Sequence, residues 1–180
     1  MKKVYVNKNI VKNIASGHPW IFSGGINKLD EDLENGEICE AFYEDTYLGT
    51  GYYNANSQIS VRILTRISQS IDVSFFEKRF EILKKEKEQF LLFTNSYRLV
   101  FGESDNLPGL VVDVYDKVVV LQIHSLGMEK LKREITDALV KVLKPFMIYE
   151  KSDSPSRLNE GMPKESSGIL YGNLISIIEI

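Results

Sequence analysis

The 180-residue sequence has little of what holds small secreted or metal-binding domains together: it contains one cysteine, Cys39, and two histidines, His18 and His124. A single cysteine cannot form an internal disulfide or a cysteine-based zinc site. Two histidines are too few for a histidine-rich metal centre. Cys39 follows Ile38 in an apolar, strand-like segment without a basic neighbour to activate its thiol, which favours a core role. The sequence therefore predicts no bound metal.

Long apolar runs are also missing. The longest, such as Leu110–Val112 and Val118–Leu121, fall far short of the roughly 20 residues that a membrane helix needs. The lysines at the N-terminus are not followed by the apolar segment of a signal peptide. We therefore expect a cytoplasmic protein with no membrane partner. With 43% hydrophobic and 26% charged residues, the composition is that of a folded chain rather than a disordered one.

Excess positive charge is lacking as well. The chain has 22 Lys and Arg against 25 Asp and Glu, a formal net charge of −3 and a pI of about 5.5. Strongly basic nucleic-acid-binding domains have a pI above about 9, so any RNA binding must use a local patch. Many acids of the first half lie in 30–44, which allows separate acidic and basic faces. The candidate basic residues are Lys2, Lys3, Lys8, Lys12, Arg62 and Arg66.

The length allows two small domains, and the residue pattern changes near position 71. Before it, short runs rich in β-branched and aromatic residues alternate with Gly, Asn and Asp, which predicts a small β-barrel. A short helix is expected from Lys8 to Ala15, closed by Gly17. The predicted strands are Lys3–Val6, Ile38–Tyr43, Tyr47–Tyr53 and Ile59–Leu64.

From residue 72 the pattern predicts a mixed unit. Asp72 is a suitable N-cap for an amphipathic helix over 72–90, in which Phe75, Phe76, Phe80 and Leu83 recur at helical spacing. Strands are predicted over 97–101, 110–115, 118–124 and 147–150, a helix over 128–143, a polar loop over 151–167 and one or two strands over 170–180. We therefore expect an α+β fold, with a β-barrel in residues 1–71 and a ββαββ-type domain in residues 72–180.

Two polar loops of the second unit carry residues suited to acid–base chemistry. They contribute Glu103, Asp105, Pro108, Gly109, Asp113, Arg157 and Glu160. Neighbouring carboxylates can perform acid–base catalysis or hold magnesium, which would describe a small hydrolase. Carboxylates among turn-forming residues more often cap backbone N–H groups, and we favour that role. For Arg157 and Glu160, an ion pair that locks the two loops together between domains is favoured over an active site.

The segment around the only tryptophan is distinctive. His18, Trp20 and Phe22 lie at the entrance to a strand, next to Gly24 and Gly25. Aromatic faces can stack on unpaired RNA bases while Arg or Lys side chains hold phosphates. For Trp20 and Phe22, filling the small core of the β unit is the favoured alternative. For His18 the two interpretations are balanced.

Four ordered segments resemble one family. They are Gly17-His18-Pro19-Trp20-Ile21-Phe22-Ser23-Gly24, residues 51–63, residues 97–115 and residues 148–161. Together they resemble the class I SAM-dependent ribosomal RNA large-subunit cytosine-5 methyltransferases. The first two segments are similar to parts of that family's PUA domain. The third, which includes Glu103 and Asp113, looks like the hallmark of its central α+β domain, and the fourth matches the segment that follows.

The resemblance implies a three-domain order: a PUA domain, a central domain and a Rossmann-like methyltransferase domain that holds the SAM site and the catalytic cysteine. The third domain is expected to be absent from these 180 residues, because the chain stops where a linking strand would lead into it. No catalytic or SAM-binding position is carried over, and Cys39 matches none. SAM is expected for the full-length family, whereas this chain alone is expected not to methylate.

The implied function is RNA binding and substrate positioning for a 23S rRNA (cytosine-C5) methyltransferase. Weak binding to ribosomal RNA is expected, because phosphate contacts dominate affinity and the bulk charge is acidic. The alternative is a stand-alone RNA-binding adaptor without catalysis. An exposed strand over 175–180 could also pair with its copy in a homodimer. The expected RNA-binding residues are Lys12, His18, Trp20, Arg62 and Arg66.

Overall fold

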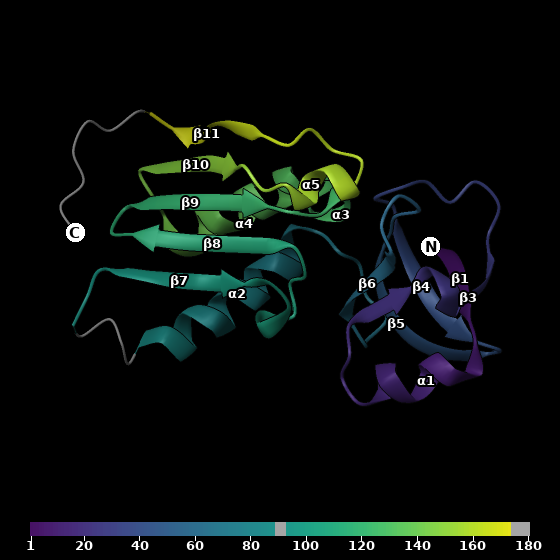
Figure 1. Cartoon of the computed structure of the whole chain (residues 1–180). Helices are drawn as coiled ribbons and strands as arrows, with labels where there is room; N and C mark the ends of the chain where they lie inside the picture. Colours follow the sequence, from purple (N-terminus) through teal and green to yellow (C-terminus); the bar gives the residue numbers. More distant parts are fainter. Residues whose placement is uncertain (89–92, 174–180) are drawn as a thin grey trace.

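The computed structural model describes residues 1–88 and 93–173. They form two units, each built on its own sheet (Figure 1). In this part of the chain no helix is both long and apolar enough to cross a membrane. The predicted α+β character is confirmed, since one unit is mainly strands and the other combines a sheet with helices.

The N-terminal unit is a curled six-stranded sheet with the order β2-β6-β5-β4-β1-β3. Strands β1 and β4 run parallel, and the other neighbours are antiparallel. The four predicted strands are confirmed, and the short strands β2 and β3 are additional. The two middle residues of β3 are polar and exposed, a pattern that does not indicate a strand. The elements are β1 (Lys2–Val6), α1 (Lys8–Ala15), β2 (Trp20–Phe22), β3 (Ile26–Leu29), β4 (Ile38–Tyr43), β5 (Thr46–Tyr53) and β6 (Ile59–Thr65).

The second unit has a five-stranded sheet with the order β11-β10-β9-β8-β7. Three strands, not the two of a ββαββ pattern, precede its central helices. Helices α2 and α4 cover one face of this sheet (Figure 1). The elements are α2 (Val73–Lys87), β7 (Ser96–Phe101), β8 (Leu110–Tyr115), β9 (Val118–Ile123), α3 (Leu126–Lys130), α4 (Lys132–Leu143), β10 (Met147–Ser152), α5 (Ser156–Asn159) and β11 (Ser166–Gly172).

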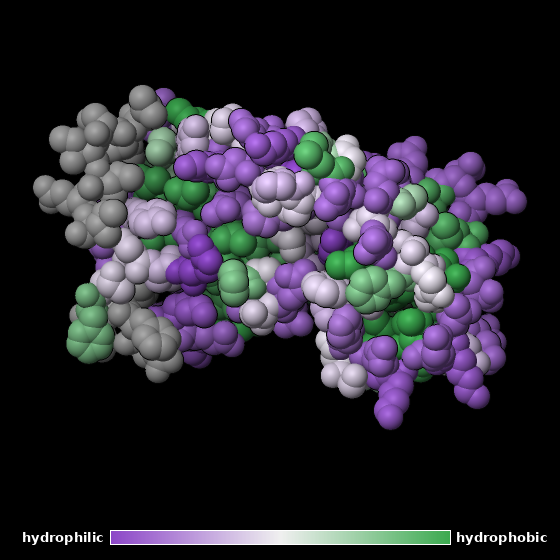
Figure 2. All heavy atoms as spheres, viewed as in Figure 1, coloured by the Kyte–Doolittle hydropathy of each residue, from purple (hydrophilic) through white to green (hydrophobic). Residues whose placement is uncertain are grey.

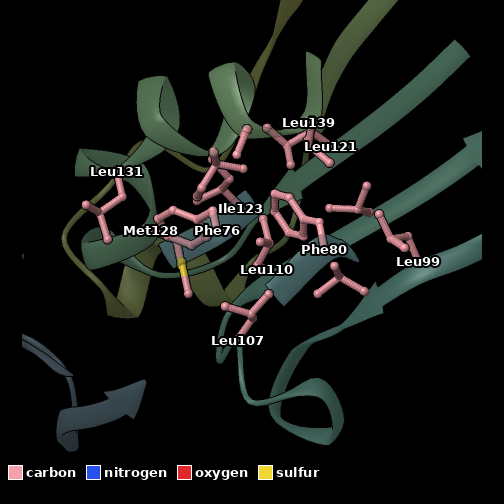
Figure 3. Packing of buried hydrophobic residues seen from close by; sticks show 14 of the residues in the cluster. Phe76, Phe80, Leu99, Leu107, Leu110, Leu121, Ile123, Met128, Leu131 and Leu139 are labelled. Carbon is pink, nitrogen blue, oxygen red and sulfur yellow. The ribbon is translucent and has the colours of Figure 1, made fainter. Parts of the chain in front are cut away.

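The helix that opens the second unit begins as predicted. The Asp72 carboxylate accepts a hydrogen bond from the Phe75 backbone N–H at 3.1 Å, which satisfies a free donor of the first turn. The apolar stripe of α2 is buried, and Phe76 and Phe80 point among strand residues such as Leu110 (Figure 3). The predicted end of this helix, near residue 90, lies outside the described residues.

The remaining elements differ from expectation in detail. The single helix predicted over 128–143 is two helices, because Leu131 departs from helical geometry with ψ near 8°. The predicted polar loop over 151–167 contains α5 and the start of β11, and β10 extends to Ser152. Of the one or two strands predicted over 170–180, the described residues include only the end of β11, which begins earlier, at Ser166. Residues 174–180, with the homodimer predicted from them, lie outside the described range.

One cross-strand row of the first sheet joins the two units. Trp20 of β2 pairs with Arg62 of β6, and Arg62 pairs with Tyr52 of β5. Directly opposed residues of neighbouring strands project from the same face of a sheet. This interdomain row of three side chains meets the end of the second sheet, where α3 and α5 lie (Figure 1).

Tyr52 is the most buried member of the interdomain row. Its ring is fully enclosed in the core of the second unit rather than that of its own sheet. Its hydroxyl donates to the Pro108 carbonyl at 2.7 Å and lies 2.8 Å from Ser125 Oγ. A Cβ placed on Gly127 would lie 2.0 Å from this ring, so only glycine permits the contact. The two units therefore share a core.

We predict that Tyr52→Phe lowers the free energy of unfolding by about 1–3 kcal/mol. The substitution leaves the buried Pro108 carbonyl and Ser125 hydroxyl without the tyrosine hydroxyl as a hydrogen-bond partner. The measurement is urea denaturation followed by circular dichroism. Tyr149→Phe is the matched control, since the half-buried Tyr149 hydroxyl has no hydrogen bond within the described residues, and it should change stability by less than about 0.5 kcal/mol. Equal effects would contradict the shared-core interpretation.

Candidate functional site

A row of aromatic rings lines the free edge of the first sheet. His18, Trp20 and Phe22 alternate along β2 and the residues before it, so their side chains project to one side. Adjacent rings meet edge to face, with centroids 5.5 Å apart for His18–Trp20 and 6.2 Å apart for Trp20–Phe22. Phe22 is 46% exposed. This aromatic row is therefore on the surface, and the prediction that Trp20 and Phe22 fill the core of the β unit is wrong.

Positive groups lie at the start of the aromatic row. Arg66 Nε donates to the Ile14 carbonyl at 3.2 Å, and Arg66 Nη2 donates to the His18 carbonyl at 3.5 Å. These bonds hold an exposed guanidinium against the end of α1, where Lys12 occupies the last turn. Of the five expected RNA-binding residues, the structure places Arg66 against His18 and His18 against Trp20, while Lys12 lies in the last turn of the neighbouring α1.

Arg62, the fifth expected RNA-binding residue, has a different environment. Its Nη2 lies 2.7 Å from Glu160 Oε1, and both side chains are largely buried, with exposures of 11% and 4%. The Asn54 amide donates to the other carboxylate oxygen at 2.9 Å and to the Glu160 carbonyl at 3.0 Å. The Leu126 backbone N–H donates to Glu160 Oε2 at 3.3 Å. The Arg62 charge is thus shared with a carboxylate of the second unit.

The pKa of Glu160 is lowered by these partners. Burial alone raises it, because a carboxylate loses hydration inside the protein. The Arg62 charge and hydrogen bonds from Ser57 and Asn54 outweigh burial, so the pKa falls below its usual range and the carboxylate stays ionised at neutral pH. Glu160 therefore forms an interdomain ion pair, although its partner is Arg62 rather than a residue of the loop over 102–109.

The predicted loop residues make structural contacts. Asp105 accepts a hydrogen bond from the Phe101 N–H at 2.6 Å, and Asp113 accepts two from Arg98, at 2.7 and 3.0 Å. Glu103 accepts one from the Trp20 indole N–H at 3.2 Å and so connects the loop to the aromatic row. Because these carboxylates have separate partners, they do not form the cluster that the hydrolase hypothesis needs.

Two further residues of the predicted loops shape the backbone. Gly109 has φ 78°, and a Cβ there would lie 2.3 Å from Ser125 Oγ, so the turn after Pro108 requires glycine. Arg157 is 1% exposed and donates to the carbonyls of Ile123 and Pro163 and to the Glu129 carboxylate. Arg157 therefore fixes its own loop to the end of β9 rather than pairing with Glu160.

A pocket of about 610 Å³ lies where the two units meet. The Arg62–Glu160 pair, Glu103 and the exposed Phe22 line it, and so does His124 from the end of β9. Burial lowers the pKa of His124, and the nearby positive charge of Arg157 lowers it further, so its imidazole is neutral near pH 7. Figure 2 shows the molecule hollowed along the junction of the units. The aromatic row ends at this pocket.

Sequence patterns did not identify several residues of this junction. Tyr52 and Asn54 lie within the family-like segment 51–63, but no local pattern specifies a partner for them, for Ser125 or for His124. The partners of Tyr52, Asn54 and Ser125 across the junction lie 56 or more positions away in the chain. The described residues hold no group of three or more His, Cys, Asp or Glu side chains that could bind a metal ion. Cys39 is fully buried, and burial raises the pKa of its thiol to about 12.

Comparison with known proteins first defines a domain. Residues 4–66 match the family described as PUA-like domain. The matched range covers β1 to β6 and ends before the helix that opens the second unit. The N-terminal unit is thus a PUA-like domain, to which an α+β unit is joined.

The whole chain has longer relatives. It is 37% identical over 172 residues to Ribosomal RNA large subunit methyltransferase I of Vibrio parahaemolyticus, and 37% identical over 172 residues to the protein of the same name from Vibrio campbellii. Each match covers 94% of this chain but 43% of the relative. The chain is therefore homologous to these methyltransferases and spans less than half of their length.

Solved structures show the same fold. A candidate SAM-dependent methyltransferase from Streptococcus mutans superposes with a TM-score of 0.79 at 23% sequence identity, over 97% of this chain and 44% of that one. A candidate methyltransferase complexed with SAH gives the same TM-score and identity over 98% of this chain. Both units thus occur together, in the same arrangement, within larger proteins.

We predict that Arg62→Ala lowers the free energy of unfolding by about 3–5 kcal/mol, because it leaves the Glu160 carboxylate buried without its partner charge. Chemical denaturation measures the loss. Lys130→Ala is the matched control: it breaks an exposed pair with Glu34 at 3.7 Å, and such pairs contribute about 0–1 kcal/mol. A loss below about 1 kcal/mol for Arg62→Ala would show that the pair does not hold the units together.

The lowered pKa of Glu160 also predicts a pH dependence. A carboxyl group whose pKa is lowered in the folded state stabilises the protein above its unfolded pKa, about 4.3 for Glu. That stability is lost as the pH falls through the folded value. Glu160→Gln should therefore be less stable than the wild type at pH 7, and the difference should shrink below about pH 4.3. A difference independent of pH in denaturant titrations would contradict this assignment.

Proposed function

We propose that this chain binds and positions RNA for a SAM-dependent ribosomal RNA methyltransferase, as the N-terminal portion of such an enzyme. The substrate class we infer is 23S rRNA, modified at C5 of a cytosine. Homology to ribosomal RNA large subunit methyltransferases over 94% of the chain supports the RNA substrate. The single observation that carries the binding role is the exposed aromatic row of His18, Trp20 and Phe22 beside cationic side chains.

Exposed rings next to cations suit single-stranded RNA. Every nucleobase has a π-face that can stack on an aromatic side chain, while Lys and Arg contact the phosphates between bases. The row lies on β2, at one end of the strand order, with Lys12 and Arg66 next to it. The acid-rich segment over 30–44 consists of β4 and the connections on either side of it, further along the sheet. A local basic patch can therefore operate in a chain of net charge −3.

The described side chains give little support for catalysis within residues 1–180. The only cysteine, Cys39, is fully buried, and its thiol has a pKa of about 12, so the thiolate needed for nucleophilic attack on a base is not formed near neutral pH. The carboxylates Glu103, Asp105 and Asp113 are engaged by separate partners. We infer that the SAM site and the catalytic cysteine belong to a part of the enzyme outside residues 1–180.

Binding to a fragment of ribosomal RNA tests the proposed function. We expect weak, salt-dependent binding by fluorescence anisotropy, with Lys12→Ala and Arg66→Ala each reducing the slope of log K against log salt by about 0.7, the value for one phosphate contact to a single strand. His18→Ala should weaken binding by loss of stacking, with less change in slope.

Lys85→Ala is the matched control for these charge changes. Lys85 is exposed on α2, away from the aromatic row, and its removal should leave the slope unchanged. Absence of salt-dependent binding by the wild-type chain would refute the RNA-binding role. Unchanged binding in all of the row variants would show that RNA uses another surface.

A further inference from the structure

The pocket between the two units has the chemistry of a heterocycle site. Its volume of about 610 Å³ falls within the range of ligand pockets. Amide side chains from Asn56 and Gln58, the neutral His124 and the Glu103 carboxylate offer both hydrogen-bond donors and acceptors. The exposed ring of Phe22 supplies an apolar wall.

The charges in the pocket exclude a phosphate. Among the described residues that line it, Arg62 is the only Lys or Arg, and the Glu160 carboxylate 2.7 Å away neutralises its charge. Glu103 adds a negative charge, and it accepts a hydrogen bond from the neutral indole N–H of Trp20. An anionic group in this pocket would meet net negative charge, whereas an uncharged ligand with N–H donors would meet acceptors.

His124 points to the same kind of ligand. Its Nε2 is buried, and within the described part of the chain it has no hydrogen-bond partner. A buried polar nitrogen without a partner costs free energy, and such atoms are uncommon in folded proteins. His124 lines the pocket, so a group bound there would lie beside its imidazole. A bound group with complementary hydrogen bonds would supply the missing partner.

We propose that this interdomain pocket receives one unpaired nucleobase of the RNA, with a preference for cytosine or adenine over uracil. The inference rests on the proposed function and adds the site and the base class. The aromatic row leads the strand to the pocket, and the phosphates stay outside, near Lys12 and Arg66. Cytosine and adenine carry an exocyclic amino group that can donate to the Glu103 carboxylate, whereas uracil presents a carbonyl oxygen there.

The fluorescence of Trp20 can be used to measure binding of a base in the pocket. It is the only tryptophan in the chain, and its indole N–H bonds to Glu103 at the edge of the pocket, so its fluorescence reports on that carboxylate. The full chain is titrated with short oligoribonucleotides of cytidine, adenosine or uridine. We expect the cytidine and adenosine oligomers to bind about tenfold more tightly than the uridine oligomer, the discrimination typical of one good base-edge contact.

Two variants separate the pocket from the rest of the RNA surface. Glu103→Gln should bring the affinity ratio between cytidine and uridine oligomers close to one, because the amide can donate to uracil as well as accept from cytosine. Ser156→Phe places a bulky side chain on an exposed residue of the pocket lining and should remove the same preference. The control, Ser167→Phe, adds the same ring to an exposed residue of β11 outside the pocket lining and should retain it.

Each outcome decides between the two proposals. Binding without base preference, or a preference that survives both Glu103→Gln and Ser156→Phe, would overturn the base pocket and leave the RNA-binding role intact. Absence of binding to every oligomer, together with absence of binding to the ribosomal RNA fragment, would refute both. Circular dichroism of each variant establishes that it is folded, and the exposed position of Ser156 keeps the test available if Glu103→Gln is unstable.

Discussion

The interdomain row of Trp20, Arg62 and Tyr52 is the interaction on which the rest of the structure depends. Three adjacent strands of the curled sheet present one residue each, and each reaches a different part of the second unit: Glu103, Glu160 and the Pro108–Ser125 region. Because neighbouring strands fix the spacing of these side chains, the second unit is held at three points along a line. Relative rotation of the units would break a buried ion pair and expose a tyrosine ring.

In the proposed function, this attachment shapes the surface that the molecule would present to RNA. The aromatic row and the interdomain pocket are continuous because Phe22 lines the pocket, and the Trp20–Glu103 hydrogen bond holds β2 against the loop over 102–109. A rigid arrangement reduces the conformational entropy lost on binding. The proposed role in substrate positioning would also require such rigidity, since positioning errors of about 1 Å can lower rates greatly.

Electrostatics operate locally in this chain. The overall charge is slightly negative, yet the acid-rich segment and the cations near α1 belong to different parts of the sheet order. Within the junction, Arg62 and Glu160 cancel each other, so a basic residue that resembles a phosphate contact in the sequence contributes mainly to holding the units together. The net charge of such a protein therefore does not indicate which surfaces are basic unless the partner of each charged residue is known.

The sequence by itself determined the local structure, with Asp72 as an N-cap, the buried stripe of α2 and most strands, and it also determined the resemblance to a family of RNA methyltransferases. These features depend on side-chain spacing and local hydrogen bonds, which neighbouring residues in the sequence specify. Only the tertiary structure decided that Glu160 pairs with Arg62, that Tyr52 enters the other unit's core and that Phe22 faces solvent. Those outcomes depend on contacts between residues tens of positions apart, whose partners no local pattern specifies.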